Sequence, residues 1–152
     1  MSKKRTAGKF ILTVAAMAVA AQIVHSAGAM LTMNYYKDPQ YFPVWSKLMM
    51  PGGGSPPGSF YLYSFLFGMV QWGVFLALFR MVKNWIPGRS PVSNGLVFGA
   101  GVFLVGGFAQ FLSLGLLINL PFALVLFWAM ETLVIDLING ALAGRLWRRI
   151  GD

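Results

Sequence analysis

Apolar residues occur in long, nearly uninterrupted runs along this chain, and polar residues are mostly confined to shorter segments between them. A helix rises 1.5 Å per residue, so about 20 apolar residues cross the roughly 30 Å of hydrocarbon in a bilayer. The runs over residues 10–33 and 60–82 have this length. The run over residues 95–142 would be about 72 Å long as one helix. It must therefore fold back on itself.

The segment Ile118-Asn119-Leu120-Pro121 is the predicted point of reversal. Asn119 can cap the start of a helix, and Pro121 suits a first helical turn. The pattern therefore predicts one domain over residues 1–152 with an all-α fold, a four-transmembrane-helix antiparallel bundle. The expected spans cover residues 10–33, 60–82, 95–117 and 122–145, with an outer loop over residues 34–59.

The outer loop has two parts of different composition. Residues 41–50 contain aromatic side chains but are too short and too often interrupted to span a membrane. We expect this part to lie along the membrane surface or to dock on a partner. Residues 51–59 are all Pro, Gly or Ser, a composition typical of flexible coil.

Composition supports lipid as the solvent of this chain. It is 57% hydrophobic and 11% charged, whereas soluble domains carry about 25% charged residues. The net charge of +8 would favour nucleic acid as the partner of a soluble protein. Here the basic residues flank apolar runs, where they set topology and meet anionic lipids, so we expect no nucleic-acid partner. Without cysteine, disulfides and thiolate chemistry are excluded.

The basic residues also predict the orientation of the spans. Only Lys37 and Lys47 fall on the outer side of the four-span arrangement. The other ten of the 12 Lys and Arg residues fall on the opposite side: Lys3, Lys4, Arg5, Lys9, Arg80, Lys83, Arg89, Arg145, Arg148 and Arg149. Because cytoplasmic loops carry an excess of Lys and Arg, we expect both ends of the chain in the cytoplasm.

A second interpretation of the first span remains open. A basic start, an apolar core over residues 10–24 and the small residues Ala27-Gly28-Ala29 form the layout of a secretory signal peptide. Cleavage after Ala29 would leave three spans.

Two acidic residues lie inside the fourth span. The insertion scale puts an acidic residue at mid-span near +2.5 to +3.5 kcal/mol, so Glu131 and Asp136 each need an explanation. They are about 140° apart around the helix and do not form a pair on one face. One interpretation is proton or cation handling inside the bundle; the other is a structural hydrogen bond to another helix or subunit.

Five polar residues from all four spans share a similar depth. At 1.5 Å per residue they occupy a slab about 6 Å thick, with Asp136 deeper. We therefore expect a polar layer in the outer half of the bundle, including a His25–Glu131 pair. A single histidine without cysteine cannot build a metal or haem site alone, so no metal and no cofactor is expected. The five residues are Gln22, His25, Gln71, Gln110 and Glu131.

Glycines repeat at a spacing that permits close helix contact. Gly95 and Gly99 form one G-x-x-x-G pattern, and Gly140 and Gly144 form another. Small residues at this spacing let helix backbones approach closely. These faces are expected to pack within the chain or to dock onto another protein or another copy.

One stretch resembles a known group of proteins. The segments Trp85-Ile86-Pro87-Gly88-Arg89-Ser90 and Asn94-Gly95-Leu96-Val97-Phe98-Gly99 look like a Pro-Gly turn leading into a glycine-rich helix start. Small four-span bacterial inner-membrane proteins of uncharacterised function contain a similar turn. The resemblance covers roughly residues 60–147 and implies a multi-pass location in the bacterial inner (cell) membrane. It implies no activity and no site residues.

Three functions from different classes follow. The first is a non-catalytic subunit or assembly factor of a larger membrane protein complex, docking through the glycine-rich faces and the aromatic outer loop. The second is a small transporter or proton/ion conductor that uses Glu131 and Asp136. The third is a membrane redox or lipid-modifying enzyme, which the absence of a catalytic motif disfavours. Expected partners are the lipid bilayer and other membrane subunits or further copies of this chain.

Overall fold

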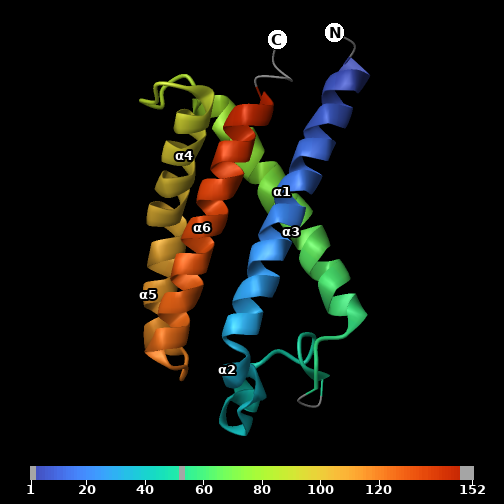
Figure 1. Ribbon diagram of the computed structural model, residues 1–152, viewed down its shortest axis with the longest axis vertical. Helices are drawn as coiled ribbons and strands as arrows, with labels where there is room; N and C mark the ends of the chain where they lie inside the picture. Colours follow the sequence, from blue (N-terminus) through green and yellow to red (C-terminus); the bar gives the residue numbers. More distant parts are fainter. Residues whose placement is uncertain (1–2, 52–53, 148–152) are drawn as a thin grey trace.

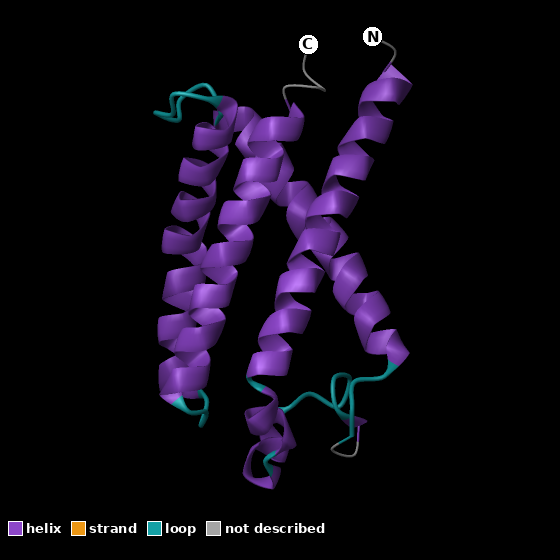
Figure 2. Ribbon diagram, in the orientation of Figure 1, coloured by secondary structure: helices purple, strands orange, loops and turns teal. Residues whose placement is uncertain are grey.

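The computed structural model describes residues 3–51 and 54–147, and every regular element among these residues is a helix (Figure 2). The all-α prediction is therefore confirmed for the described chain. In order, the elements are α1 (Lys3–Leu31), α2 (Met33–Lys37), η1 (Pro39–Val44), α3 (Gly58–Val82), α4 (Pro91–Val102), η3 (Phe103–Gly107), α5 (Phe108–Leu117) and α6 (Phe122–Trp147).

Four helical segments are long and apolar enough to cross a membrane, which indicates a multi-pass membrane protein. Each overlaps one of the four predicted spans. The segments are Thr6–Leu31, Gly58–Val82, Pro91–Leu117 and Phe122–Leu146.

The third of these segments differs from the prediction at its start and in its middle. It begins at Pro91 because the Ser90 hydroxyl accepts a hydrogen bond from the Ser93 N–H at 3.1 Å, which caps the helix. In its middle, η3 is a short π-helical segment between α4 and α5. Such segments are rare insertions in α-helices, and the apolar pattern did not predict this one.

The reversal between α5 and α6 lies where the sequence predicts it. Ile118 is extended, and α6 begins at Phe122. Pro121 is the residue before the helix, and its carbonyl accepts hydrogen bonds from the N–H groups of Leu124 and Val125. The predicted cap at Asn119 is wrong, because α6 begins at Phe122 and two residues, Leu120 and Pro121, lie between Asn119 and the helix.

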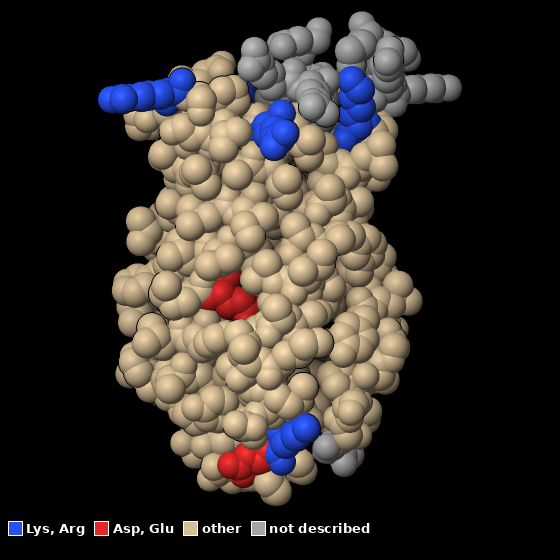
Figure 3. Space-filling model, viewed as in Figure 1, with Lys and Arg blue, Asp and Glu red and all other residues tan. Residues whose placement is uncertain are grey.

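The ends of the spans gather at two ends of the molecule (Figure 1). The start of α1, the end of α3, the start of α4 and the end of α6 lie together, and we call this the basic end. In Figure 3, Lys and Arg side chains cluster there, whereas the middle of the face is uncharged apart from an acidic area. The opposite end carries α2 and η1, and we call it the loop end. The predicted cytoplasmic residues Arg148 and Arg149 lie outside the described residues.

Helices α4 and α6 lie side by side and touch through backbone atoms (Figure 1). A Cβ atom added to Gly95 would collide with the Gly140 carbonyl, and one added to Gly99 would collide with the Asp136 carbonyl. One added to Gly144 would collide with the Pro91 carbonyl. Both glycine patterns therefore meet each other within the chain, and this face is not free to dock on a partner.

Helices α1 and α3 cross at a point where both side chains are small. A Cβ atom added to Gly68 would lie 3.6 Å from the Cβ of Ala18. Towards the basic end the space beside this crossing is filled by a core that includes Met17, Leu76 and Phe79, which are 0%, 0% and 2% exposed. Towards the loop end the two helices diverge (Figure 1). This divergence makes room for the candidate site.

Candidate functional site

An open cavity of about 530 Å³ lies at the loop end, and the connection between α2 and α3 contributes Met49 and Pro56 to its lining. A volume of this size is within the usual range for small-molecule sites, about 300–1,000 Å³. All four spans contribute to its lining, so it forms only when the helices are packed together. The lining residues are Gln22, His25, Ser26, Ala29, Met30, Met33, Tyr36, Met49, Pro56, Phe60, Tyr61, Ser64, Phe111, Trp128, Glu131 and Thr132.

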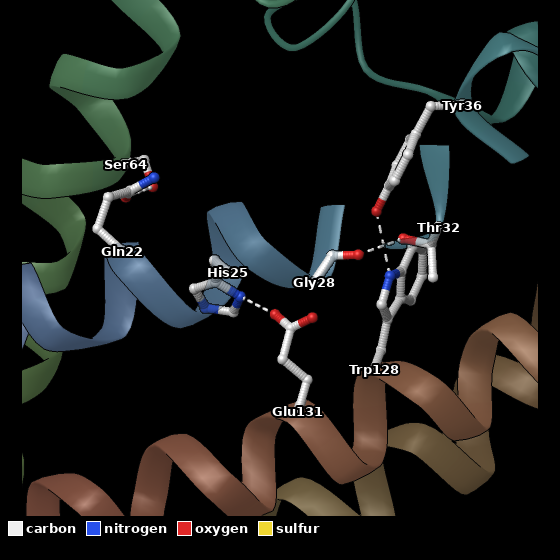
Figure 4. Close-up of polar contacts among 8 residues, drawn as sticks. All are labelled: Gln22, His25, Gly28, Thr32, Tyr36, Ser64, Trp128 and Glu131. Carbon is white, nitrogen blue, oxygen red and sulfur yellow. Dashed lines mark hydrogen bonds and ion pairs between the residues drawn. The ribbon is translucent and has the colours of Figure 1, made fainter. Parts of the chain in front are cut away.

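The centre of the polar lining is a contact between α1 and α6. Nδ1 of His25 meets Oε1 of Glu131 (Figure 4). The side chain of Glu131 is 8% exposed, whereas that of His25 is 53% exposed. A buried carboxylate needs a charged or hydrogen-bonding partner. His25 provides that partner and presents the rest of its ring to the cavity.

Gly28 provides the space for the Glu131 carboxyl group. A Cβ atom added to Gly28 would overlap Oε2 of Glu131 and would lie 3.3 Å from the ring of Phe127. The carboxyl therefore occupies a notch that exists only because residue 28 has no side chain. Since Gly28 is one turn beyond His25 on α1, the same stretch of helix supplies both the notch and the partner.

A second polar contact joins α1 to α3. The Ser64 hydroxyl donates a hydrogen bond to Oε1 of Gln22 at 3.0 Å (Figure 4). A second cavity, of about 330 Å³, adjoins the first, and both are lined by Gln22, His25, Phe60 and Ser64. The hydrogen bond therefore spans the diverging helices at the boundary between two adjoining cavities.

An aromatic cluster holds the loop region against α6. Nε1 of Trp128 donates a hydrogen bond to the Tyr36 hydroxyl at 3.1 Å (Figure 4). The Trp45 ring packs against both side chains, with its centroid 4.9 Å from that of Tyr36 and 6.1 Å from that of Trp128. The aromatic part of the outer loop thus packs on its own chain through Trp45.

The hydroxyl of Tyr36 is a neutral group in this setting. Burial raises its pKa above the ordinary value of 10.0, and the nearby negative charge of Glu131 acts in the same direction. The oxygen accepts a hydrogen bond from Trp128, and the Thr32 side chain is a second hydrogen-bond partner of the Tyr36 hydroxyl. Tyr36 therefore contributes a neutral, already hydrogen-bonded hydroxyl to the cavity lining.

The structure brings together only some of the predicted polar residues. His25 and Glu131 are in contact, Gln22 bonds to Ser64, and Gln71 lines the second cavity with its side chain exposed. Gln110 is different, since it is exposed on α5 and lines neither cavity. The predicted residues of α1, α3 and α6 thus line the two adjoining cavities, whereas Gln110 does not.

Asp136 is also separate from the cavity. It is 5% exposed and lies beside the contact between α4 and α6, where its carbonyl faces Gly99. Within residues 3–51 and 54–147, no group of three or more His, Cys, Asp and Glu is arranged to hold a metal ion. Asp136 therefore does not belong to the site that Glu131 forms with His25.

Several residues of the site carried no clear signal in the sequence. Ser64 and Trp128 are ordinary residues of apolar helices, and Gly28 reads equally well as part of a signal peptide. Outside the lining of both cavities, Asn139 of α6 is fully buried, and neither atom of its amide has a hydrogen-bond partner in the described structure. A polar residue in an apolar run was the one signal that would have identified Ser64 and Asn139.

Comparisons of the chain with protein-family models, with curated proteins and with solved structures found no match. The function is therefore argued from the geometry of the cavity.

Proposed function

We propose that this protein is a small transporter of the bacterial inner membrane that exchanges a proton for a solute bound in the larger cavity. The observation that carries the proposal is the contact between the buried carboxylate of Glu131 and the half-exposed ring of His25 in the lining of that cavity. An ionisable residue inside a membrane span marks a pathway for solutes or protons in many membrane proteins.

The His25–Glu131 pair can change its protonation without leaving a lone charge in the apolar surroundings. An imidazolium next to a carboxylate has no net charge, and neither does a neutral imidazole next to a carboxylic acid. Loss of one proton leaves a single negative charge at Glu131, which a bound solute must then balance. Release of the proton and binding of the solute are coupled for this reason.

The proposed topology is an antiparallel four-helix bundle with the basic end in the cytoplasm. The described Lys and Arg side chains at that end support it, since Lys and Arg are enriched on the cytoplasmic side. The core around Met17, Leu76 and Phe79 is closed towards the basic end. In this topology the loop end faces outward, and we propose that the open cavity is the outward-facing form of the solute site.

Proton movement in proteoliposomes tests the proposal. The full chain is reconstituted with a trapped pH-sensitive dye, and cationic, neutral and anionic solutes are added outside. We expect at least one class to drive proton movement that is lost in Glu131→Gln. Gln110→Leu is the matched control, because it removes a polar group of similar depth that lies outside both cavities. If no class moves protons, or if Glu131→Gln behaves as the wild type, the protein is not a proton-coupled transporter.

The exposed position of Gln110 favours a second function. In this function the protein is a subunit of a larger membrane complex or of a homo-oligomer. Only 6% of an apolar 18-residue window of the span Pro91–Leu117 is buried, and Gln110 is exposed in this span. An amide facing lipid is unfavourable, and a hydrogen bond to another helix would satisfy it. Native mass spectrometry from membranes tests this second function, and Gln110→Leu is expected to reduce the assembled fraction while Leu116→Ala leaves it unchanged. Detection of the wild-type protein only as a monomer would exclude this second function.

A further inference from the structure

We infer that the solute is an organic cation with an apolar or aromatic body, a step that rests on the proposed transport function. Three properties of the larger cavity point to this class: the charge of its lining, the chemistry of its walls and the position of the exchangeable proton.

Charge is the first property. The titratable side chains that line the cavity are His25 from α1, Tyr36 from α2, Tyr61 from α3 and Glu131 from α6; no Lys or Arg from the described residues lines it. Glu131 is therefore the one formal negative charge of the lining, and its charge is uncompensated once His25 is neutral. An anion in this cavity would face the carboxylate with no fixed positive charge to stabilise it.

The walls are the second property. Five aromatic side chains line the cavity, including Tyr36 and Trp128. A cation over the face of an aromatic ring is attracted by the electrons of that ring. Three methionines, Met30, Met33 and Met49, complete the apolar lining, and methionine adapts its shape to irregular apolar ligands. The walls thus suit a cationic head group attached to an apolar body.

The site of the proton is the third property. In the structure His25 contacts the carboxylate that would bind the cation. When a cation takes the place of the imidazolium beside Glu131, the proton leaves the exposed ring of His25 for the water of the outer compartment. The cavity loses one positive charge and gains one, so its net charge stays the same. A neutral solute offers no charge to replace that proton.

Three solutes with the same benzyl body separate these possibilities: benzyltrimethylammonium, benzyl alcohol and benzylsulfonate. Binding to the full chain in nanodiscs is measured by calorimetry in buffers of different ionisation enthalpy, and proton movement is measured in proteoliposomes. We expect the cation alone to bind with release of about one proton and to drive proton movement. Glu131→Gln should weaken its binding at least tenfold.

His25→Asn tests the role of the proton separately. This variant should still bind the cation, but it should release fewer protons on binding than the wild type at the same pH, because the imidazole is absent. Thermal unfolding shows whether either variant has failed to fold, and His25→Asn keeps the test valid if Glu131→Gln does not fold.

Two results would overturn the inference while leaving the transport function intact. One is proton movement driven by benzyl alcohol or benzylsulfonate and not by the cation. The other is cation binding that is equally tight in the wild type and in a folded Glu131→Gln. Failure of every solute class to move protons would instead overturn the transport function.

Discussion

At the basic end, α4 and α6 are in backbone contact, and buried side chains, including Met17, Leu76 and Phe79, fill the core. At the loop end, α1 and α3 diverge around an open cavity. Glycine serves both ends in different ways: Gly95 and Gly99 admit another backbone, whereas Gly28 admits a carboxyl group. The same residue type therefore gives close packing at one end and a recess for a functional group at the other.

The two acidic residues of α6 also differ in whether they lie in a closely packed region or beside an open cavity. Glu131 contacts His25 and lines a cavity, whereas Asp136 is buried beside the contact between α4 and α6 and lines neither cavity. They are five positions apart along the helix, so they project in different directions. An acidic residue in a span gains access to a solute only when its face of the helix meets an open region.

The largest effect is expected from a side chain in the glycine contact. Gly99→Leu places carbon atoms where the Asp136 carbonyl lies, and neither backbone can move aside cheaply. We expect a loss of about 3 kcal/mol or more in the free energy of unfolding, measured by thermal unfolding in nanodiscs. Gly101→Ala is the matched control on the same helix, because a Cβ atom there meets nothing within 4 Å. Equal stability of the two variants would show that the helices do not touch at Gly99.

A smaller loss of stability is expected at the loop end from His25→Leu. This change leaves the buried carboxylate of Glu131 without its partner, which should cost about 1–3 kcal/mol. His25→Gln, which retains a hydrogen-bond donor, should recover part of the loss. Gln71→Leu serves as the control, since Gln71 is exposed and lies at a similar depth. Unchanged thermal stability in His25→Leu would mean that the pair contributes nothing.

Gly28→Ala should separate the pair at a stability cost of only about 1 kcal/mol, because the group that must move is the flexible end of a side chain. His25 is the one histidine of the chain, so its ring gives a single assignable set of NMR signals. These signals should move towards those of an exposed imidazole. Gly73→Ala, where a Cβ atom meets nothing within 4 Å, should leave them in place. Identical spectra for both variants would show that Gly28 does not make room for the Glu131 carboxyl group.

The smallest effect is expected from Trp128→Phe, which keeps an aromatic ring and removes the hydrogen bond to Tyr36. A loss of about 1 kcal/mol or less is expected, together with faster proteolysis of the outer loop. Tyr36→Phe removes the acceptor of the same hydrogen bond. The double variant should therefore be as stable as the less stable of the two single variants. Additive losses would show that the two residues act independently.

Depth along the membrane normal could be predicted from the sequence, and direction around each helix could not. The depth count placed His25 and Glu131 at the same level, and the structure brings them into contact. The same count placed Gln110 at that level, but its side chain is exposed on α5. Helix rise sets depth for every residue alike, whereas the facing partner depends on how the helices cross.

The sequence by itself determined that the chain is helical, that it has four apolar spans and that it reverses near Pro121. Bilayer thickness and the geometry of the α-helix leave few other arrangements for such apolar runs. Only the tertiary structure decided that Gly28 makes room for Glu131, that the glycine patterns face each other and that α1 and α3 diverge around a cavity. These features depend on contacts between residues far apart in the sequence, and such contacts follow from the rotation and crossing of each helix.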